Sequence, residues 1–223
     1  MQKLKIQYGS LLLCLIAVQS GFPLHAMAGS SSWTIDSKTS NVHFYTKNGA
    51  SMSVQGTFSN VSGEVQYDPA MPDGSRVLAK IPLSTISTSI VKRDEDLKSV
   101  GYFDVAKYAD ASFVSTKFAK QAGSGSGAKR ALNGKNSGSK SSTNKYVLTG
   151  KFTLHGVTRV VDVLMDLPKL TTGKAGQSRL SAIGSTVVDQ GDYNLTLKKL
   201  HPDGFVWINK AITIVIKIDA VKK

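Results

Sequence analysis

Apolar and polar residues alternate with a period of two along most of this chain, the pattern of β-strands that have one face on an apolar interior. The alternation is clearest in residues 212–220, 146–154 and 161–167. Further strands are expected at residues 33–36, 41–45, 52–59, 62–67, 76–83, 112–118, 180–188 and 204–208. Turn-forming sequences such as Pro72-Asp73-Gly74 and His155-Gly156 separate them. The chain is therefore predicted to be all-β, with about ten strands.

Many short strands with one apolar face assemble either into a sandwich of two sheets or into a closed barrel. Periodicity alone leaves both architectures open. Two segments interrupt the strand pattern, residues 93–100 and residues 190–194. The first is charged and compatible with a helix: Asp94 and Glu95 would lie near its N-terminus, where negative charge is favourable, and Lys98 follows Asp94 by four residues. We interpret this acid cluster as structural rather than catalytic.

The first 28 residues have the features of a cleavable secretory signal peptide. Two lysines precede a short apolar run at residues 11–18, and Ala26-Met27-Ala28 fits cleavage after Ala28. The apolar run is too short to span a bilayer, so we expect a periplasmic protein whose mature domain, residues 29–223, has no transmembrane segment. Cys14 is the only cysteine of the sequence. The mature domain must therefore be stabilised by an apolar core and not by disulfides.

Much of the positive charge lies in one segment. The formal net charge is +13 at pH 7, and residues 120–145 hold six lysine or arginine residues without any acidic residue. The same segment is rich in Gly, Ser and Asn, so it cannot offset its ordering entropy by burial, and we predict a flexible basic insertion between two strands. No aromatic residues alternate with its charges as base stacking would require, which argues against nucleic-acid binding.

The sequence predicts no catalytic or metal-binding residues. Outside the signal peptide the histidines are His43, His155 and His201, and no pair has the spacing of zinc ligands. The chain contains no G-x-S-x-G segment, and a lone histidine with a distant aspartate is not a catalytic triad. We therefore expect a protein that is not an enzyme and needs no cofactor.

Several short motifs that are not generic to β-proteins lie on both sides of the insertion. They are Trp33-Thr34-Ile35-Asp36, Val54-Gln55-Gly56-Thr57-Phe58, Gly63-Glu64-Val65, Arg93-Asp94 with Leu97-Lys98-Ser99, Tyr102-Phe103-Asp104, Tyr108, Phe113 with Ser115-Thr116, and Leu148-Thr149-Gly150 with Leu154-His155-Gly156-Val157-Thr158. In this order they resemble the YceI-like family of exported bacterial lipid-binding proteins. The similarity runs from Trp33 to Val221.

The resemblance implies an extended antiparallel, lipocalin-like β-barrel with a helix beside it and a long apolar cavity. It also implies that the cavity holds a polyisoprenoid chain or a similar amphiphilic lipid, in a role of periplasmic transport or storage without catalysis. Residues of the apolar faces are then the candidate ligand-lining residues: Phe44, Phe58, Val65, Ile81, Ile90, Tyr102, Phe103, Phe113, Phe152, Leu154, Val161, Val163, Ile214 and Ile216. Tyr102 and Phe103 would close one end of the barrel from the helix.

Other functions stay open at this point. One alternative is a structural or interaction protein whose barrel is filled by its own side chains and whose basic loop contacts anionic surface components. Another is an exported hydrolase with an unrecognised site. The polar residues also depart from the family pattern, because Lys38-Thr39-Ser40 stands where members often have a His-Ser pair. The identity of the lipid and its head group, the pairing of two barrels into a homodimer and the physiological process are therefore left unspecified.

Overall fold

The computed structural model describes residues 31–48, 52–121, 145–173, 176–195 and 211–223. The expected signal peptide, the expected strand at 204–208 and most of the basic insertion lie outside these residues. Within them the chain forms the strands β1 (Ser31–Ile35), β2 (Asn41–Asn48), β3 (Met52–Phe58), β4 (Ser62–Tyr67), β5 (Arg76–Pro82), β6 (Asp110–Lys120), β7 (Tyr146–Leu154), β8 (Val157–Met165), β9 (Lys169–Thr172), β10 (Ser178–Asp189) and β11 (Ala211–Lys222). The helical elements are α1 (Val91–Lys98) and the 3₁₀ turns η1 (Pro72–Gly74), η2 (Leu83–Thr85) and η3 (Gln190–Tyr193).

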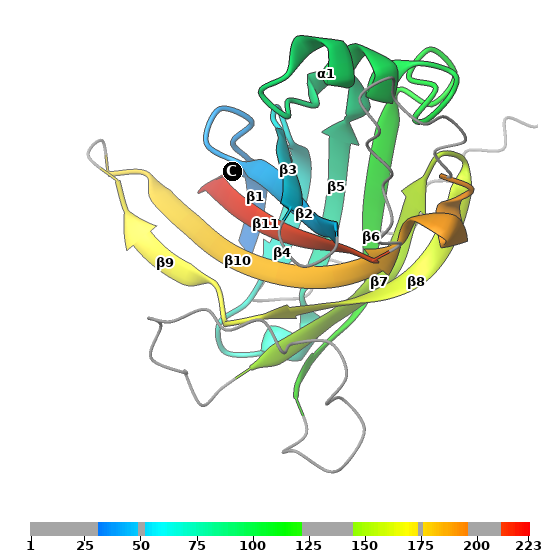
Figure 1. Cartoon of the computed structure of the whole chain (residues 1–223). Helices are drawn as coiled ribbons and strands as arrows, with labels where there is room; N and C mark the ends of the chain where they lie inside the picture. Colours follow the sequence, from blue (N-terminus) through cyan, green and yellow to red (C-terminus); the bar gives the residue numbers. More distant parts are fainter. Residues whose placement is uncertain (1–30, 49–51, 122–144, 174–175, 196–210) are drawn as a thin grey trace, which may run out of the picture.

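Eight of these strands close into an antiparallel barrel (Figure 1). The ring runs β11–β1–β4–β5–β6–β7–β8–β10 and returns to β11, and every pair of neighbours in it is antiparallel. The other three strands lengthen the wall: β2 pairs with β11 beyond β1, β3 pairs with β2, and β9 pairs with β10 next to β8. The expected antiparallel barrel with one helical segment is confirmed.

Alternation along each strand places one set of side chains inside the barrel. In β7 the inward set is Leu148, Gly150, Phe152 and Leu154, all buried. β6 contains a bulge between Ser115 and Lys117, which shifts its register with β7 by one residue. The bulge turns the apolar residues on both sides of it toward the interior. As a result both Phe113 and Phe118, five residues apart, are buried.

Two glycines of the wall make room for aromatic rings. A Cβ atom at Gly150 would lie 2.4 Å from Cζ of Phe113, and one at Gly56 would lie 2.5 Å from Cζ of Phe44. Both distances are far inside van der Waals contact. Only glycine therefore allows each ring to lie against the neighbouring strand, which explains why glycine occurs in the middle of these two strands.

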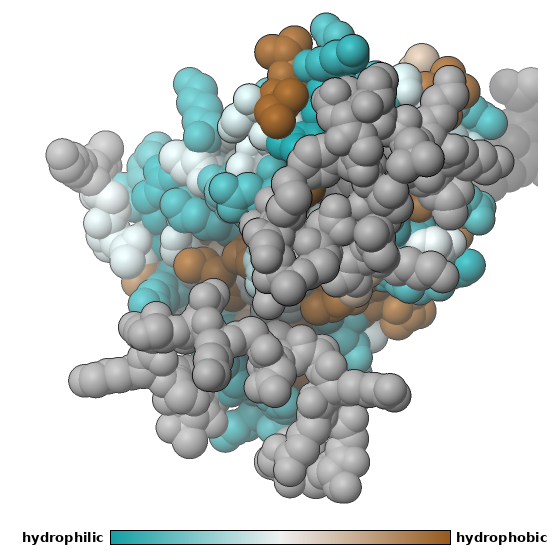
Figure 2. Space-filling model, viewed as in Figure 1, coloured by the Kyte–Doolittle hydropathy of each residue, from teal (hydrophilic) through white to brown (hydrophobic). Residues whose placement is uncertain are grey.

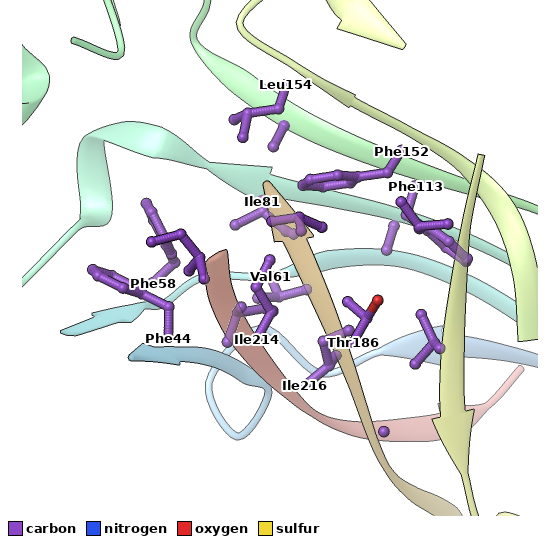
Figure 3. Close-up of a pocket in the computed structure, with 18 of the residues that line it drawn as sticks. Phe44, Phe58, Val61, Ile81, Phe113, Phe152, Leu154, Thr186, Ile214 and Ile216 are labelled. Atoms are coloured by element: carbon purple, nitrogen blue, oxygen red, sulfur yellow. The ribbon is translucent and has the colours of Figure 1, made fainter. Parts of the chain in front are cut away.

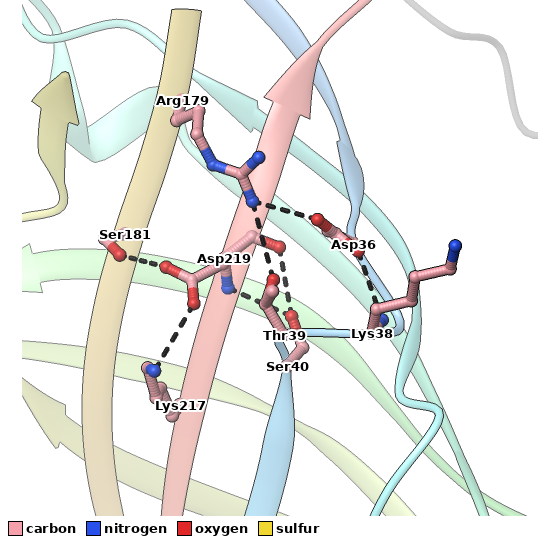
Figure 4. Close-up of polar contacts among 8 residues, drawn as sticks. All are labelled: Asp36, Lys38, Thr39, Ser40, Arg179, Ser181, Lys217 and Asp219. Carbon is pink, nitrogen blue, oxygen red and sulfur yellow. Dashed lines mark hydrogen bonds and ion pairs between the residues drawn. The ribbon is translucent and has the colours of Figure 1, made fainter. Parts of the chain in front are cut away.

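An interruption at residues 36–40 separates β1 from β2, although both pair with β11 (Figure 4). The backbone of Asp219 compensates for the missing ladder bonds. Its carbonyl accepts hydrogen bonds from the Asp36 nitrogen at 2.8 Å and the Ser40 hydroxyl at 3.0 Å, and its N–H donates to the Ser40 oxygen at 3.0 Å. Ser40 is only 2% exposed, so this hydroxyl serves as a buried substitute for a backbone partner.

An ion pair holds the same interruption against β10. The Arg179 guanidinium lies 2.9 Å from Oδ2 of Asp36, and Oδ1 of Asp36 accepts a hydrogen bond from the Lys38 nitrogen. The hydrogen bond from Arg179, opposed in part by desolvation, lowers the pKa of Asp36. On the adjacent stretch of sheet the Asp219 carboxylate accepts a hydrogen bond from the Ser181 hydroxyl. Together with the hydrogen bonds to the Asp219 backbone, the ion pair holds the turn between β1 and β2 against β10 and β11.

α1 lies across one end of the barrel, near β3 and β5 (Figure 1). It runs from Val91 to Lys98, two residues earlier at each end than the expected segment 93–100. Leu97 is its one buried residue, while Ile90 and Val91 beside its N-terminus are exposed. Figure 2 shows an apolar group among hydrophilic side chains at this end of the molecule. No helix of the described residues is long and apolar enough to cross a membrane.

Candidate functional site

The barrel encloses a cavity of about 180 Å³ (Figure 3). Its wall is formed by inward-facing residues of nearly every strand of the ring and is completed by α1 and the segments beside it. The side chains are overwhelmingly aliphatic or aromatic. Among the described residues that line the cavity none is charged, and only Tyr102, Thr186, Gln190 and Tyr193 carry a polar side-chain group. Such a cavity suits an apolar molecule.

The void lies against β10 and β11. Along β11, Ile218 and Ala220 are buried, whereas Ile212, Ile214 and Ile216 are only half-buried although all of them line the cavity or its apolar core. A residue that points into a tightly filled barrel would have little accessible surface. The remaining exposure of these isoleucines therefore marks the part of the barrel that its own side chains leave unfilled.

The structure brings together almost all of the candidate ligand-lining residues. Thirteen of the fourteen lie on the cavity wall: Phe44, Phe58, Val65, Ile81, Tyr102, Phe103, Phe113, Phe152, Leu154, Val161, Val163, Ile214 and Ile216. Ile90 is the exception and that assignment is wrong, because its side chain is 52% exposed and does not line the cavity. Ile90 occupies the N-cap position of α1, outside every strand, so no strand alternation turns its side chain inward.

The segment after α1 closes the cavity with two aromatic rings. Tyr102 and Phe103 are both buried and pack edge to face, with ring centroids 4.7 Å apart. Phe103 in turn meets the ring of Phe58 at 6.0 Å, and Phe58 meets Phe44 at 5.5 Å. This row of rings continues the wall from β2 and β3 to the helix. It places Tyr102 and Phe103 where the sequence analysis expected them, at the end of the barrel next to α1.

Two of the charged residues of α1, Arg93 and Asp94, attach the helix to the barrel. Oδ1 of Asp94 accepts hydrogen bonds from the backbone nitrogen and the hydroxyl of Thr88, at 2.8 and 2.5 Å. Arg93 donates from Nε to the Thr88 hydroxyl and from Nη2 to the Thr88 carbonyl. The preceding residue, Ser87, forms a bridge with Thr57 of β3. Asp94 and Arg93 therefore anchor the first turn of the helix to the strand below it.

Three polar residues that line the cavity, Thr186, Gln190 and Tyr193, were not among the candidates from the sequence. Gln190 begins η3, and its Oε1 accepts a hydrogen bond of 3.0 Å from the buried Tyr102 hydroxyl. Burial raises the pKa of Tyr102, so this phenol remains a hydrogen-bond donor at neutral pH. Thr186 lies on β10 and also faces the cavity. The sequence pattern that could have revealed Thr186 and Gln190 is their even spacing from inward-facing neighbours. Positions 180, 182, 184, 186, 188 and 190 all line the cavity.

Histidine and acidic residues do not assemble into a metal centre in the part of the chain that the structure describes. His43 is exposed on β2. His155 occupies the tight turn between β7 and β8 at a φ of 50°, and its Nδ1 lies 3.3 Å from the Tyr193 carbonyl oxygen. Its ring also packs against Tyr108, at 4.6 Å between centroids. His201 lies outside the described residues. His155 therefore has structural partners that account for its position.

Comparison with known proteins agrees with this geometry. The YceI-like domain model matches residues 33–220. A UPF0312 protein of Shewanella sp. MR-7 is 26% identical over 82% of this chain and 87% of its own length, and one of Vibrio parahaemolyticus is 24% identical over 81% and 85%.

Two solved structures share the fold at low sequence identity. Burkholderia cenocepacia BcnA matches with a TM-score of 0.58 at 19% identity, over 85% of this chain and 99% of that chain. A protein of Saccharophagus degradans described as a polyisoprenoid binding domain matches with a TM-score of 0.59 at 14% identity, over 86% and 99%. Because the domain model spans nearly the whole described barrel, the chain belongs to the YceI-like family.

Proposed function

We propose that this protein binds an apolar chain, a polyisoprenoid or a similar amphiphilic lipid, inside its barrel and carries or stores it without chemical change. The observation that carries this proposal is the uncharged cavity, because burial of hydrocarbon is the interaction its wall offers. The description of the Saccharophagus degradans relative as a polyisoprenoid binding domain supports the same ligand class.

Burial alone supplies enough affinity for such a role. Ten methylene equivalents at about 0.8 kcal/mol each give a gross gain of about 8 kcal/mol, which corresponds to a dissociation constant near 1 μM before association costs. A longer prenyl chain that fills more of the barrel would exceed those costs. No general acid, base or metal is required for this function.

The alternative, a barrel filled by its own side chains, is less compatible with the cavity of about 180 Å³. Under that alternative the basic insertion would be the functional element, and its deletion would abolish binding to partners. Under our proposal the basic insertion, residues 120–145, is not needed for lipid binding, so a chain in which a short turn replaces its central residues 122–144 keeps its affinity for lipid. The flanks of this segment already meet, since the Gln121 nitrogen donates to the Lys145 carbonyl at 2.8 Å, so the deletion can be closed by a short turn.

Native mass spectrometry of the gently purified full-length protein tests the proposal directly. We expect an adduct whose mass matches an extractable apolar lipid, or a one-to-one complex when a prenyl lipid is added to delipidated protein. A protein that is always empty and takes up none of the added prenyl lipids would refute the carrier function. We further infer export to the periplasm from residues 1–28, and amino-terminal sequencing of the fractionated protein should then begin at Gly29.

A further inference from the structure

Thr186 is a polar interruption in an otherwise apolar part of the cavity wall. It lies on β10 between Gly184 and Val188, and Figure 3 shows its hydroxyl among the apolar side chains that surround the void. Its register partner on β11 is Ile214, whose partner on β2 is Phe44, so these three cavity-lining side chains lie in one row across the inner face of the sheet. Thr186 is only half-buried, so an occupant of the cavity can reach it.

No hydrogen bond joins the Thr186 hydroxyl to another described residue, and on the same cavity wall the buried hydroxyl of Tyr193 also has no partner among them. A hydroxyl that lines an apolar site without a partner is unfavourable by about 1–3 kcal/mol once it is desolvated. Valine has nearly the same shape and would avoid this penalty. A cavity built only for hydrocarbon would therefore gain from valine at this position, and the hydroxyl is explained if a ligand supplies its partner.

A second polar side chain lies just beyond the end of β10. Gln190 begins η3, four residues after Thr186, and is already paired with Tyr102. No cation lines the cavity among the described residues. A phosphate or carboxylate buried beside Thr186 would thus lose its hydration without gaining an opposite charge, which is strongly unfavourable.

From these observations we propose that Thr186 hydrogen-bonds a neutral polar group of the ligand, a hydroxyl or a carbonyl, and that the cavity selects neutral amphiphiles over ionised ones. The inference rests on the proposed carrier function. It adds the chemical class of the ligand's polar group and the residue that recognises it.

Three ligands with one C20 all-trans isoprenoid chain test the inference: the alcohol, the parent hydrocarbon and the monophosphate. Their affinities are measured by displacement of a fluorescent apolar dye from the full-length protein. Thr186→Val keeps the side-chain shape and removes the hydroxyl, whereas Thr186→Ser keeps the hydroxyl. We expect Thr186→Val to weaken binding of the alcohol about tenfold and to leave the hydrocarbon unchanged, while Thr186→Ser retains the preference of the wild type.

Each outcome has a distinct meaning. An alcohol-to-hydrocarbon affinity ratio that is the same in wild type and Thr186→Val overturns the inference but leaves the carrier function intact. A monophosphate that binds more tightly than the alcohol places the polar group outside the cavity and also overturns it. If none of the three ligands displaces the dye, the carrier function itself fails, and the role of Thr186 falls with it.

Discussion

Filling the cavity with a side chain is the most direct test of where the ligand lies. Ala182 faces the cavity on β10, and the adjacent Ile183 points outward with 62% exposure. Ala182→Phe places a phenyl ring in the void, and Ile183→Phe adds similar bulk to the outer face of the same strand. The two variants therefore differ in the side of the wall that receives the ring.

The expected effect follows from the size of the cavity. Complete filling of about 180 Å³ would stabilise the protein by about 4 kcal/mol at ~24 cal/mol per Å³. One ring fills part of this volume and also introduces strain of about 1–3 kcal/mol, so the free energy of unfolding of ligand-free Ala182→Phe should stay close to that of the wild type. The same ring displaces roughly five methylene equivalents of ligand, a loss of about 4 kcal/mol or about a thousandfold in affinity.

Thermal unfolding without a prenyl lipid measures the stability of each ligand-free variant, and the rise in Tm on adding the lipid measures its binding. At a lipid concentration of about 100 times the wild-type dissociation constant, binding adds about 2.7 kcal/mol and raises Tm by roughly 5–10 °C. Under the same conditions Ala182→Phe should show a shift below about 1 °C, and Ile183→Phe should keep the shift of the wild type. A folded Ala182→Phe protein with an undiminished shift would refute the reasoning, since the ligand would then bind elsewhere.

Three further predictions concern the barrel itself. Ser40→Ala leaves the part-buried N–H of Asp219 without its side-chain acceptor, so it should lower the free energy of unfolding in urea by about 1–3 kcal/mol; no change would mean that another group replaces the hydroxyl. Asp36→Asn should cost up to about 1 kcal/mol at pH 7 through the loss of its pair with Arg179. Because the pKa of Asp36 is lowered in the folded state, this difference should persist above about pH 4 and disappear as the pH falls below the folded pKa; a difference that grows in acid would contradict the sign. Gly150→Ala should destabilise the barrel by about 1–3 kcal/mol or more, because its Cβ would meet a phenyl ring, and calorimetry with unaltered Tm would show that the ring moves freely.

Alternation predicted the strands well where one face is buried. All strands of the described residues were expected except β9, Lys169–Thr172, whose four residues are all exposed and therefore show no apolar face. The bulge in β6 was also missed. Two buried phenylalanines five residues apart contradict a strict period of two, but only the register with β7 shows where the extra residue lies.

Contacts between residues far apart in the sequence explain why the arrangement of β1 and β2 was not predicted. Nothing in the local sequence shows that β1 and β2 share one edge of β11, because that arrangement depends on the Asp219 backbone far along the chain. Thr186 was overlooked for a different reason. A polar residue in a strand is ordinarily assigned to the solvent face, and here the parity of the neighbouring apolar residues was the better guide.

The rings of Phe113 and Phe44, each of which lies against a glycine, determine the inner width of the barrel. Phe113 reaches Gly150 and Phe44 reaches Gly56 with the far tips of their rings, so each ring lies along the wall and does not project toward the barrel axis. An interior rich in phenylalanine thereby keeps an open lumen. A methyl group at either glycine would tilt the ring inward and narrow the passage, which would favour slender unbranched chains over methyl-branched ones. Two residues without side chains thus limit the thickness of the molecule that this barrel admits.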